Sequence, residues 1–369
     1  MSFVFRTLTV LLLAGISAAA AAVPSEVPCT TPVRKPGFCV DIRRCANIYR
    51  IVTDPNPPLI GLANYIRKAA CTLPRVERSV CCVPSEIDLK AKVVALPTKC
   101  GQAVTDRIAY GNVTKVFDFP WMAVLKYKTI AGYMTDACGG TLIHKRYVLT
   151  AAHCLRTPSK IQIHTVRLGE HDKSSEIDCN IYRNPRGMVI QEECAKKPVD
   201  YGIESMVLHE NYNKPTRSND IGLIRLDRDV KMDDHIHPIC LPVTPALRSL
   251  ELKRYLVTGW GTTENQIGSD VLLSAVLPSV SNEDCNKRWQ KFNARVYDTD
   301  MCAGGENFVD SCEGDSGGPL GFPATYNGVR FVQFGVVARG GSFCGAENRP
   351  GIYTRVAPYM DWIMANIEP

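Results

Sequence analysis

A serine framed by glycines, Ser316 in the stretch DSCEGDSGGPL, is the residue best suited to nucleophilic chemistry. Gly314, Ser316 and Gly318 form a Gly-x-Ser-x-Gly pattern, which can present a serine hydroxyl on a tight turn. The pattern alone is ambiguous, because glycine and serine are also ordinary turn residues. A nucleophile is indicated only if the rest of the chain supplies a base and an acid.

A serine nucleophile needs a histidine to take its proton and a carboxylate to orient that histidine. Among the seven histidines His153 stands out, because it follows a strand-like run in VLTAAHC and neighbours Cys154. The others lie in polar loops or, for His144, at a strand edge, and are interpreted as exposed. Asp220 enters the apolar run NDIGLIRL, where a buried carboxylate needs a hydrogen-bonding partner. Capping of a turn is the alternative role for Asp220.

The order of these residues along the chain discriminates between folds. The α/β-hydrolases carry serine, then acid, then histidine, whereas here the last histidine, His237, precedes Ser316. The observed order of His153, Asp220 and Ser316 is that of the chymotrypsin class.

Composition and the N-terminus indicate a secreted protein. Sixteen cysteines in 369 residues are typical of an oxidising compartment, and the net charge of +6 comes from scattered basic residues, unlike a nucleic-acid footprint. MSFVFRTLTVLLLAGISAAAAAV has the regions of a secretory signal, with cleavage expected near Ala22. An uncleaved anchor is the alternative, but the run from Leu8 to Val23 is short for a bilayer span.

The cysteines divide the chain into two parts. Six lie between Cys29 and Cys82 and ten more follow from Cys100, with VPSEIDLKAKVVALPTK between them as a linker. A domain as small as the first part needs disulfides to fold. Zinc is disfavoured there, because the chain has no Cys-x-x-Cys and Cys81 directly precedes Cys82.

The second part is strand-like from about Ile108 onward. Short β-branched or aromatic runs such as WMAVLKYK, LIRLDRDV, YLVTGWG and VRFVQFGVVAR are broken by Gly, Pro and Asn. Helical periodicity is clear only near the end, where VAPYMDWIMANI places Val356, Met360, Ile363 and Ile367 on one face. This pattern predicts an all-β sandwich or barrel with a closing helix.

The motifs TAAHC, DIGLIRL, GWG and CEGDSGGPL together resemble the trypsin/chymotrypsin family, from about Cys100 to Pro369. The resemblance implies an all-β fold, a chymotrypsin-like double β-barrel with a C-terminal helix, whose triad lies between the barrels. It makes His153 the general base and acid, Asp220 the residue that orients the imidazole, and Ser316 the nucleophile.

The same resemblance assigns an oxyanion hole and a specificity pocket. The N–H groups of Gly314 and Ser316 would form the hole, and glycine suits the close approach of a substrate. Asp310, six residues before Ser316, stands where trypsin-like members carry the acid at the pocket base, with Gly340 and Gly351 in the walls. The resemblance therefore implies cleavage after Arg or Lys, with a plain loop acid as the alternative for Asp310.

Two positions depart from the family pattern. Ala338 replaces a serine that usually donates a hydrogen bond to the triad acid, and Arg339 replaces an aromatic residue that often lines the pocket entrance. We expect Arg339 to favour an acidic substrate residue just before the cleaved one.

The stretch TDRIAYGN resembles the activation site of the family. Cleavage after Arg107 by another trypsin-like protease would free Ile108, whose ammonium would pair with Asp315. Because an α-amine has a pKa near 8, raised further by such a pair, the active conformation is expected to fail at strongly alkaline pH.

The first six cysteines, in CTTPVRKPGFCVDIRRCANIY, CTLP and VCC, resemble an arthropod clip domain. Their spacing alone leaves the pairing open. The resemblance implies the disulfides Cys29–Cys81, Cys39–Cys71, Cys45–Cys82, Cys100–Cys240, Cys138–Cys154, Cys285–Cys302 and Cys312–Cys344, which leaves Cys179–Cys194 to close an extra loop. The Cys100–Cys240 bond would keep the N-terminal part attached after activation.

These assignments give a signal peptide at 1–22, a clip domain at 29–82, a linker and activation segment at 83–107, and a trypsin-like protease domain at 108–369. The resemblance implies a secreted, extracellular zymogen of a trypsin-like endopeptidase, acting in haemolymph cascades of Toll-ligand processing, melanisation or dorsoventral patterning. The implied partners are a protein substrate (a downstream zymogen or cytokine precursor), an upstream activating protease and a serpin, with no nucleic acid and no membrane. The alternative is a non-catalytic clip-domain homologue acting as an adaptor, although such homologues often lack the serine found here.

Two minor sites remain. Asn112 in NVT is the only glycosylation sequon. No cofactor is required by the chemistry, but Glu170 in LGEHD begins a loop that binds calcium in some relatives, and several acids follow as candidate ligands. These acids are Asp172, Asp178, Glu192 and Glu193.

Overall fold

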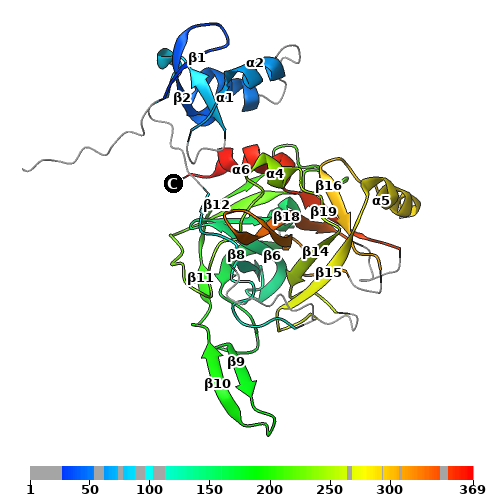
Figure 1. Ribbon diagram of the computed structural model, residues 1–369. Coiled ribbons are helices and arrows are strands. Elements are labelled where there is room, and N and C mark those ends of the chain that lie inside the picture. Colours follow the sequence, from blue (N-terminus) through cyan, green and yellow to red (C-terminus); the bar gives the residue numbers. More distant parts are fainter. Residues whose placement is uncertain are drawn as a thin grey trace, which may run out of the picture. The chain divides into compact units, whose positions relative to one another are not determined.

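The computed structural model describes two compact units, residues 1–93 and 94–369 (Figure 1). The described residues are 27–53, 62–73, 78–88, 96–102, 113–158, 160–263, 268–292, 294–306, 310–340 and 348–368. The predicted signal peptide lies outside them. Among the described residues, no helix is long and apolar enough to cross a membrane.

The N-terminal unit is a four-stranded antiparallel sheet with two short helices. In sheet order its strands are β1 (Val27–Thr30), β2 (Pro36–Asp41), β4 (Ser79–Cys82) and β3 (Ala70–Cys71), and its helices are α1 (Ala46–Thr53) and α2 (Leu62–Ala69). Its core is small, built from Val40, Ile42, Ile48 and Val80 around buried cystines. The cysteine pairs are those that the clip resemblance implies: Cys29–Cys81, Cys39–Cys71 and Cys45–Cys82.

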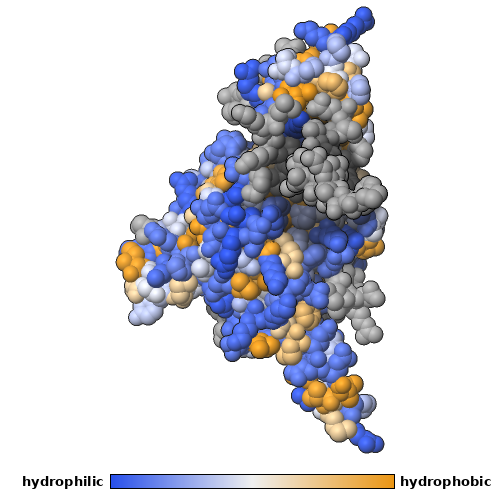
Figure 2. Space-filling model, turned by 90° about the vertical axis from the view of Figure 1, so that its left-hand side faces the viewer, coloured by the Kyte–Doolittle hydropathy of each residue, from blue (hydrophilic) through white to orange (hydrophobic). Residues whose placement is uncertain are grey.

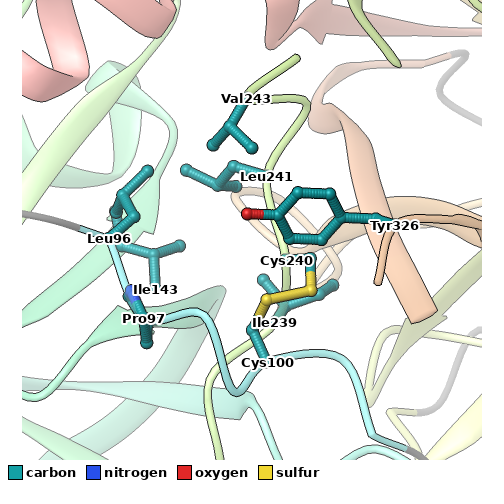
Figure 3. Close-up of a pocket in the computed structure, with 9 residues that line it drawn as sticks. All are labelled: Leu96, Pro97, Cys100, Ile143, Ile239, Cys240, Leu241, Val243 and Tyr326. Carbon is teal, nitrogen blue, oxygen red and sulfur yellow. A yellow bond between two sulfur atoms is a disulfide. The ribbon is translucent and has the colours of Figure 1, made fainter. Parts of the chain in front are cut away.

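Residues of the predicted linker, 83–107, pack on each of the two units. Ile87 pairs with Cys45 and packs on the core of the N-terminal unit. On the other side, Leu96 packs on the core of the second unit. Figure 3 shows Leu96 and Pro97 over the Cys100–Cys240 disulfide, around a small apolar cavity of about 10 Å³.

The first half of the second unit is a seven-stranded sheet of order β11-β8-β5-β6-β7-β13-β12. Its strands are β5 (Met122–Thr129), β6 (Met134–His144), β7 (Tyr147–Thr150), β8 (Ile161–Leu168), β11 (Val199–Tyr201), β12 (Ile203–Leu208) and β13 (Gly222–Leu226). Fully buried residues of these strands, among them Leu125, Ile143 and Leu149, join Trp121, just before β5, in the larger core.

The second half is a closed barrel of order β14-β15-β16-β19-β18-β17. Its strands are β14 (Arg254–Gly259), β15 (Leu273–Val280), β16 (Asp300–Ala303), β17 (Pro319–Thr325), β18 (Val329–Arg339) and β19 (Gly351–Arg355). The short helices of this unit are α3 (Ala152–Leu155), α4 (Pro245–Arg248), α5 (Asn282–Trp289) and α6 (Met360–Asn366). The predicted all-β class and the closing helix are confirmed, since Val356, Met360, Ile363 and Ile367 are all buried.

A hairpin of β9 (Cys179–Arg183) and β10 (Val189–Cys194) projects from the second unit (Figures 1 and 2). The Cys179–Cys194 disulfide closes its base. Met188, Val189 and Ile190 are exposed near its tip, where Figure 2 shows apolar surface.

Candidate active site

The structure brings His153 and Asp220 together through strand pairing. Thr150 at the end of β7 pairs with Gly222 at the start of β13, so the histidine that follows β7 meets the acid that precedes β13. The Nδ1 atom of His153 lies 2.7 Å from Oδ2 of Asp220, and the His153 backbone N–H donates to Oδ1 at 2.8 Å. Asp220 is fully buried. With Nδ1 held by the carboxylate, Nε2 is the ring nitrogen left to exchange a proton with a nucleophile.

Ser316 lies where the sheet meets the barrel. Gly139 of β6 donates its N–H to the Ser316 carbonyl at 2.8 Å, and Gly317 donates to Val337 of β18 at 2.8 Å. The Cys154 sulfur lies 3.7 Å from Nε2 of His153 and 3.6 Å from the Ser316 carbonyl oxygen, so the histidine and the serine are both next to this sulfur. Gly317 has a φ of 80°, and a side chain there would collide with the Thr150 hydroxyl. Only glycine fits this turn.

The residues around Ser316 suit an oxyanion hole and an internal ion pair. Gly314 has a φ of 100°, a left-handed conformation that favours glycine. Asp315 accepts from the N–H groups of Gly261 and Cys312, at 2.8 Å each. Burial raises the pKa of Asp315 to about 6, although these backbone donors favour its ionised form. No cation pairs with Asp315 among the described residues.

The GWG motif also has a physical role that sequence reasoning missed. A side chain at Gly259 or Gly261 would collide with the Asp315 carboxylate. These glycines therefore make room for the acid, and their spacing around Trp260 was the available signal.

Asp310 is surrounded by glycines. Its Oδ1 accepts from the Ser311 N–H at 2.8 Å, and a Cβ at Gly304 or Gly351 would approach that oxygen within 2.9 Å and 2.8 Å. Burial raises the pKa of Asp310 to about 7. Among the described residues, a Cβ at Gly340 would meet only the Ser311 carbonyl, at 4.0 Å.

Sequence reasoning missed Tyr353 and Ser311, which lie beside Asp310. The two hydroxyls lie 3.0 Å apart, and that of Tyr353 lies 3.4 Å from the Asp310 carboxylate. They add polar contacts beside the Asp310 carboxylate, so that Asp310 is held by more than its own loop.

The Arg339 guanidinium does not point freely toward a substrate. It donates to the buried Asp300 carboxylate at 2.8 Å, to the Arg295 carbonyl at 2.6 Å and to the Thr216 carbonyl. Its charge is therefore compensated inside the protein. This removes the reason to expect a preference for acidic substrate residues.

Protein donors contact the acids proposed as calcium ligands. Arg167 donates to Glu170 at 3.2 Å and to both oxygens of Asp200, at 2.7 and 2.8 Å. The other Glu170 oxygen accepts from the His171 N–H at 3.1 Å, and Asp178 accepts from two backbone N–H groups. Burial raises the pKa of Glu170. Because Arg167 contacts one Glu170 oxygen and a backbone N–H contacts the other, we expect this loop to bind no calcium.

Thermal unfolding should therefore be insensitive to calcium. Ligand at about 100 times its Kd stabilises a protein by about 2.7 kcal/mol, which would raise the Tm of a domain this size by about 5–10 °C. We expect no such shift when calcium replaces EDTA. Magnesium is the matched control, and a rise specific to calcium would contradict this interpretation.

Several predicted residues lie outside the described part of the chain: Arg107, Ile108, Asn112 and Cys344. The second unit contains the pairs Cys100–Cys240, Cys138–Cys154, Cys179–Cys194 and Cys285–Cys302, as the resemblance implies. Two histidines interpreted as exposed, His144 and His235, are buried.

A buried aspartate bonded to a histidine, beside a glycine-framed serine, is the arrangement of a serine endopeptidase. The family Trypsin matches residues 108–363, and the family Regulatory CLIP domain of proteinases matches residues 29–82. The chain belongs to the trypsin family, as a clip-domain serine protease.

Known relatives match nearly the whole length of this chain. Serine protease grass of Drosophila melanogaster is 38% identical over 348 residues, covering 91% of this chain and 89% of the relative. Melanization protease 1 of the same species is 34% identical over 378 residues, covering 92% of each. The crystal structure of the Drosophila Grass clip serine protease of the Toll pathway matches with a TM-score of 0.66 at 36% identity, covering 92% of this chain and 96% of that one.

Proposed function

We propose that the chain is a secreted zymogen, cut after Arg107, whose active form cleaves proteins after Arg or Lys in an extracellular cascade. The observation that carries the specificity is the position of Asp310. Its carboxylate lies among Gly304, Gly351 and Tyr353, and Gly340 lies near the carbonyl of the adjacent Ser311. A carboxylate at the base of such a pocket pairs with a guanidinium or an ammonium group.

The three triad residues act on the substrate through the Ser316 hydroxyl. The Ser316 hydroxyl attacks the substrate carbonyl carbon while His153 takes its proton at Nε2, and Asp220 stabilises the imidazolium. The N–H groups of Gly314 and Ser316 bind the oxyanion of the tetrahedral intermediate. His153 then protonates the leaving amine, the peptide bond breaks, and water releases the acyl group by the same steps.

Activation would give Asp315 a cation, which it does not have among the described residues. The carboxylate is buried and held by two backbone N–H groups, so a new ammonium at Ile108 would gain a desolvated partner. Because Asp315 directly precedes Ser316, the pair would order the turn that carries the nucleophile and the oxyanion hole. The Cys100–Cys240 bond would keep the clip unit attached.

The cascade role is supported by the names of the relatives. One acts in the Toll pathway and one is named for melanisation. The proposed partners are a zymogen or cytokine precursor as substrate, an upstream activating protease, and a serpin as inhibitor, met outside the cell. The proposed specificity is tested by digesting a mixture of denatured proteins with the activated chain and identifying every new terminus. Cleavage only after Arg and Lys supports the proposal, and frequent cleavage after other residues contradicts it.

Binding of a cationic inhibitor should depend on pH through Asp310. Because burial raises the pKa of Asp310 to about 7, the carboxyl is largely neutral below that pH and attracts no cation. We expect the Kd of benzamidine to fall about tenfold per pH unit up to pH 7 and to level off above it. Calorimetry from pH 5.5 to 8.5 measures this change. A Kd that is constant over the range would contradict the assignment.

A further inference from the structure

The turn that leads into Asp220 is strained. Arg217 and Asn219 have φ values of 52° and 54°, in the left-handed region that residues other than glycine rarely adopt. Such conformations persist only where surrounding contacts hold them in place. Because this turn directly precedes Asp220, its position sets where the carboxylate lies.

Asp220 depends on its backbone for this placement. Among the described residues, His153 alone donates to its carboxylate. Its carbonyl accepts from the Thr354 hydroxyl at 2.9 Å. Ala338, on the nearby end of β18, is buried but carries no group that could donate to the acid.

Two arginines join the turn to the end of β18. Arg339 donates to the Thr216 carbonyl, and in return Arg217 donates to the Ala338 carbonyl at 3.1 Å. At the far end of the turn, the Tyr359 hydroxyl donates to the Asn219 side chain at 2.7 Å. The strained residues are therefore enclosed by contacts from the barrel.

Arg339 is itself held in place by a buried acid, Asp300. Asp300 is 2% exposed and accepts from the guanidinium at 2.8 Å. Asp300 pairs across β16 and β19 with Thr354, and Thr354 pairs with Val336 of β18. The anchor, the contact to the Asp220 carbonyl and the arginine thus lie on three neighbouring strands of one barrel.

The contacts between Arg339 and the turn cross between the two halves of the protease unit. The turn belongs to the connection between β12 and β13 of the sheet, whereas Arg339 and Asp300 belong to the barrel. We propose that Arg339, seated on Asp300, is a positioning residue for Asp220, which fixes the carboxylate against His153 in place of a direct hydrogen bond from residue 338.

The proposal predicts that a hydroxyl at residue 338 becomes useful only when the arginine is lost. In the activated enzyme, Arg339→Ala should lower kcat about 10- to 100-fold with KM changed less than about threefold, because a small displacement of a catalytic group has effects of this size. Ala338→Ser alone should change kcat less than about twofold. In the double variant the serine should restore kcat about tenfold, which is non-additive behaviour between coupled residues.

The measurements are designed to separate positioning from folding. Active sites are titrated and each kcat is expressed per titrated site, so unfolded protein does not enter the comparison. The acid limb of kcat/KM against pH should move in Arg339→Ala and return in the double variant, because a displaced Asp220 stabilises the imidazolium less well. If Arg339→Ala does not fold, the same cycle is run with Arg339→Lys, which keeps the charge but cannot reach three acceptors.

Two further variants give controls. Asp300→Asn should reproduce part of the loss, whereas Arg330→Ala, on the same strand but without a contact to the turn, should stay within about twofold of wild type. The proposal would be overturned if Ala338→Ser raised kcat by the same factor with and without Arg339. It would also be overturned if Arg339→Ala changed only KM. The inference rests on the proposed activation: a wild-type chain that is inactive after cleavage would refute the proposed function, whereas an active wild type with no coupling refutes only the positioning role.

Discussion

Replacing Ser316 with alanine is expected to lower kcat of the activated protease by about 10⁵- to 10⁶-fold, because the reaction loses its nucleophile. The glycines, the Asp315 contacts and the His153–Asp220 pair do not involve the hydroxyl, so the variant should still fold and bind substrate. Hydrolysis of an arginyl peptide amide, at enzyme concentrations high enough to detect the residual rate, measures the loss.

Ser249→Ala is the matched control for this variant. Ser249 is an exposed serine at the end of α4, and its removal should leave kcat unchanged. Substantial turnover by Ser316→Ala that resists removal of contaminating protease would mean that another residue attacks the substrate.

Asp310→Ser should abolish most of the preference for basic residues. Removing one partner of a buried ion pair costs about 3–5 kcal/mol, which corresponds to a fall in kcat/KM for arginyl peptides of about 10²- to 10⁴-fold. Rates for peptides with an apolar residue before the cleaved bond should stay the same or rise, because a buried carboxylate no longer opposes their entry.

The control for Asp310→Ser is Asp298→Ser, which removes an exposed acid from the same half of the unit. It should leave the ratio of rates for arginyl and apolar peptides unchanged. If Asp310→Ser cleaved arginyl peptides as fast as wild type, the pocket acid would have to be another residue.

The parts of the fold that the sequence predicted are those with strong local patterns. The run VRFVQFGVVAR forms β18 over its full length, and the helical face from Val356 to Ile367 packs into the core. The candidate site could be predicted for a related reason. His153 and Asp220 belong to short motifs whose chain order distinguishes between folds, and the structure joins them at 2.7 Å.

Elements without a local pattern were missed. Helix α5 has the sequence NEDCNKRW, in which only Cys285 and Trp289 face the core, so no apolar period is visible. Its start signal was present, because the Ser281 side chain accepts from the Asp284 N–H. The helices of the clip unit are equally short. They pack a few apolar residues, among them Ile48 and Ala69, on a small core, next to the cystines of Cys45 and Cys71.

Contacts between distant segments could not be predicted at all. Asp300 is one of two aspartates in YDTDMCA, and its role appears only through Arg339, 39 residues later. Arg339 in turn meets Thr216, 123 residues earlier. A charged residue was expected to face the substrate, but a buried partner turned it inward.

The most direct test is to measure hydrolysis of an arginyl peptide before and after limited trypsin treatment, with N-terminal sequencing of the product. We predict negligible activity before treatment, and a new N-terminus at Ile108 that appears in step with arginine-specific activity. The Cys100–Cys240 bond should keep the two fragments together until reduction. A clean cut after Arg107 without activity would contradict the proposed protease and favour an adaptor. Full activity with the Arg107–Ile108 peptide bond intact would contradict the zymogen.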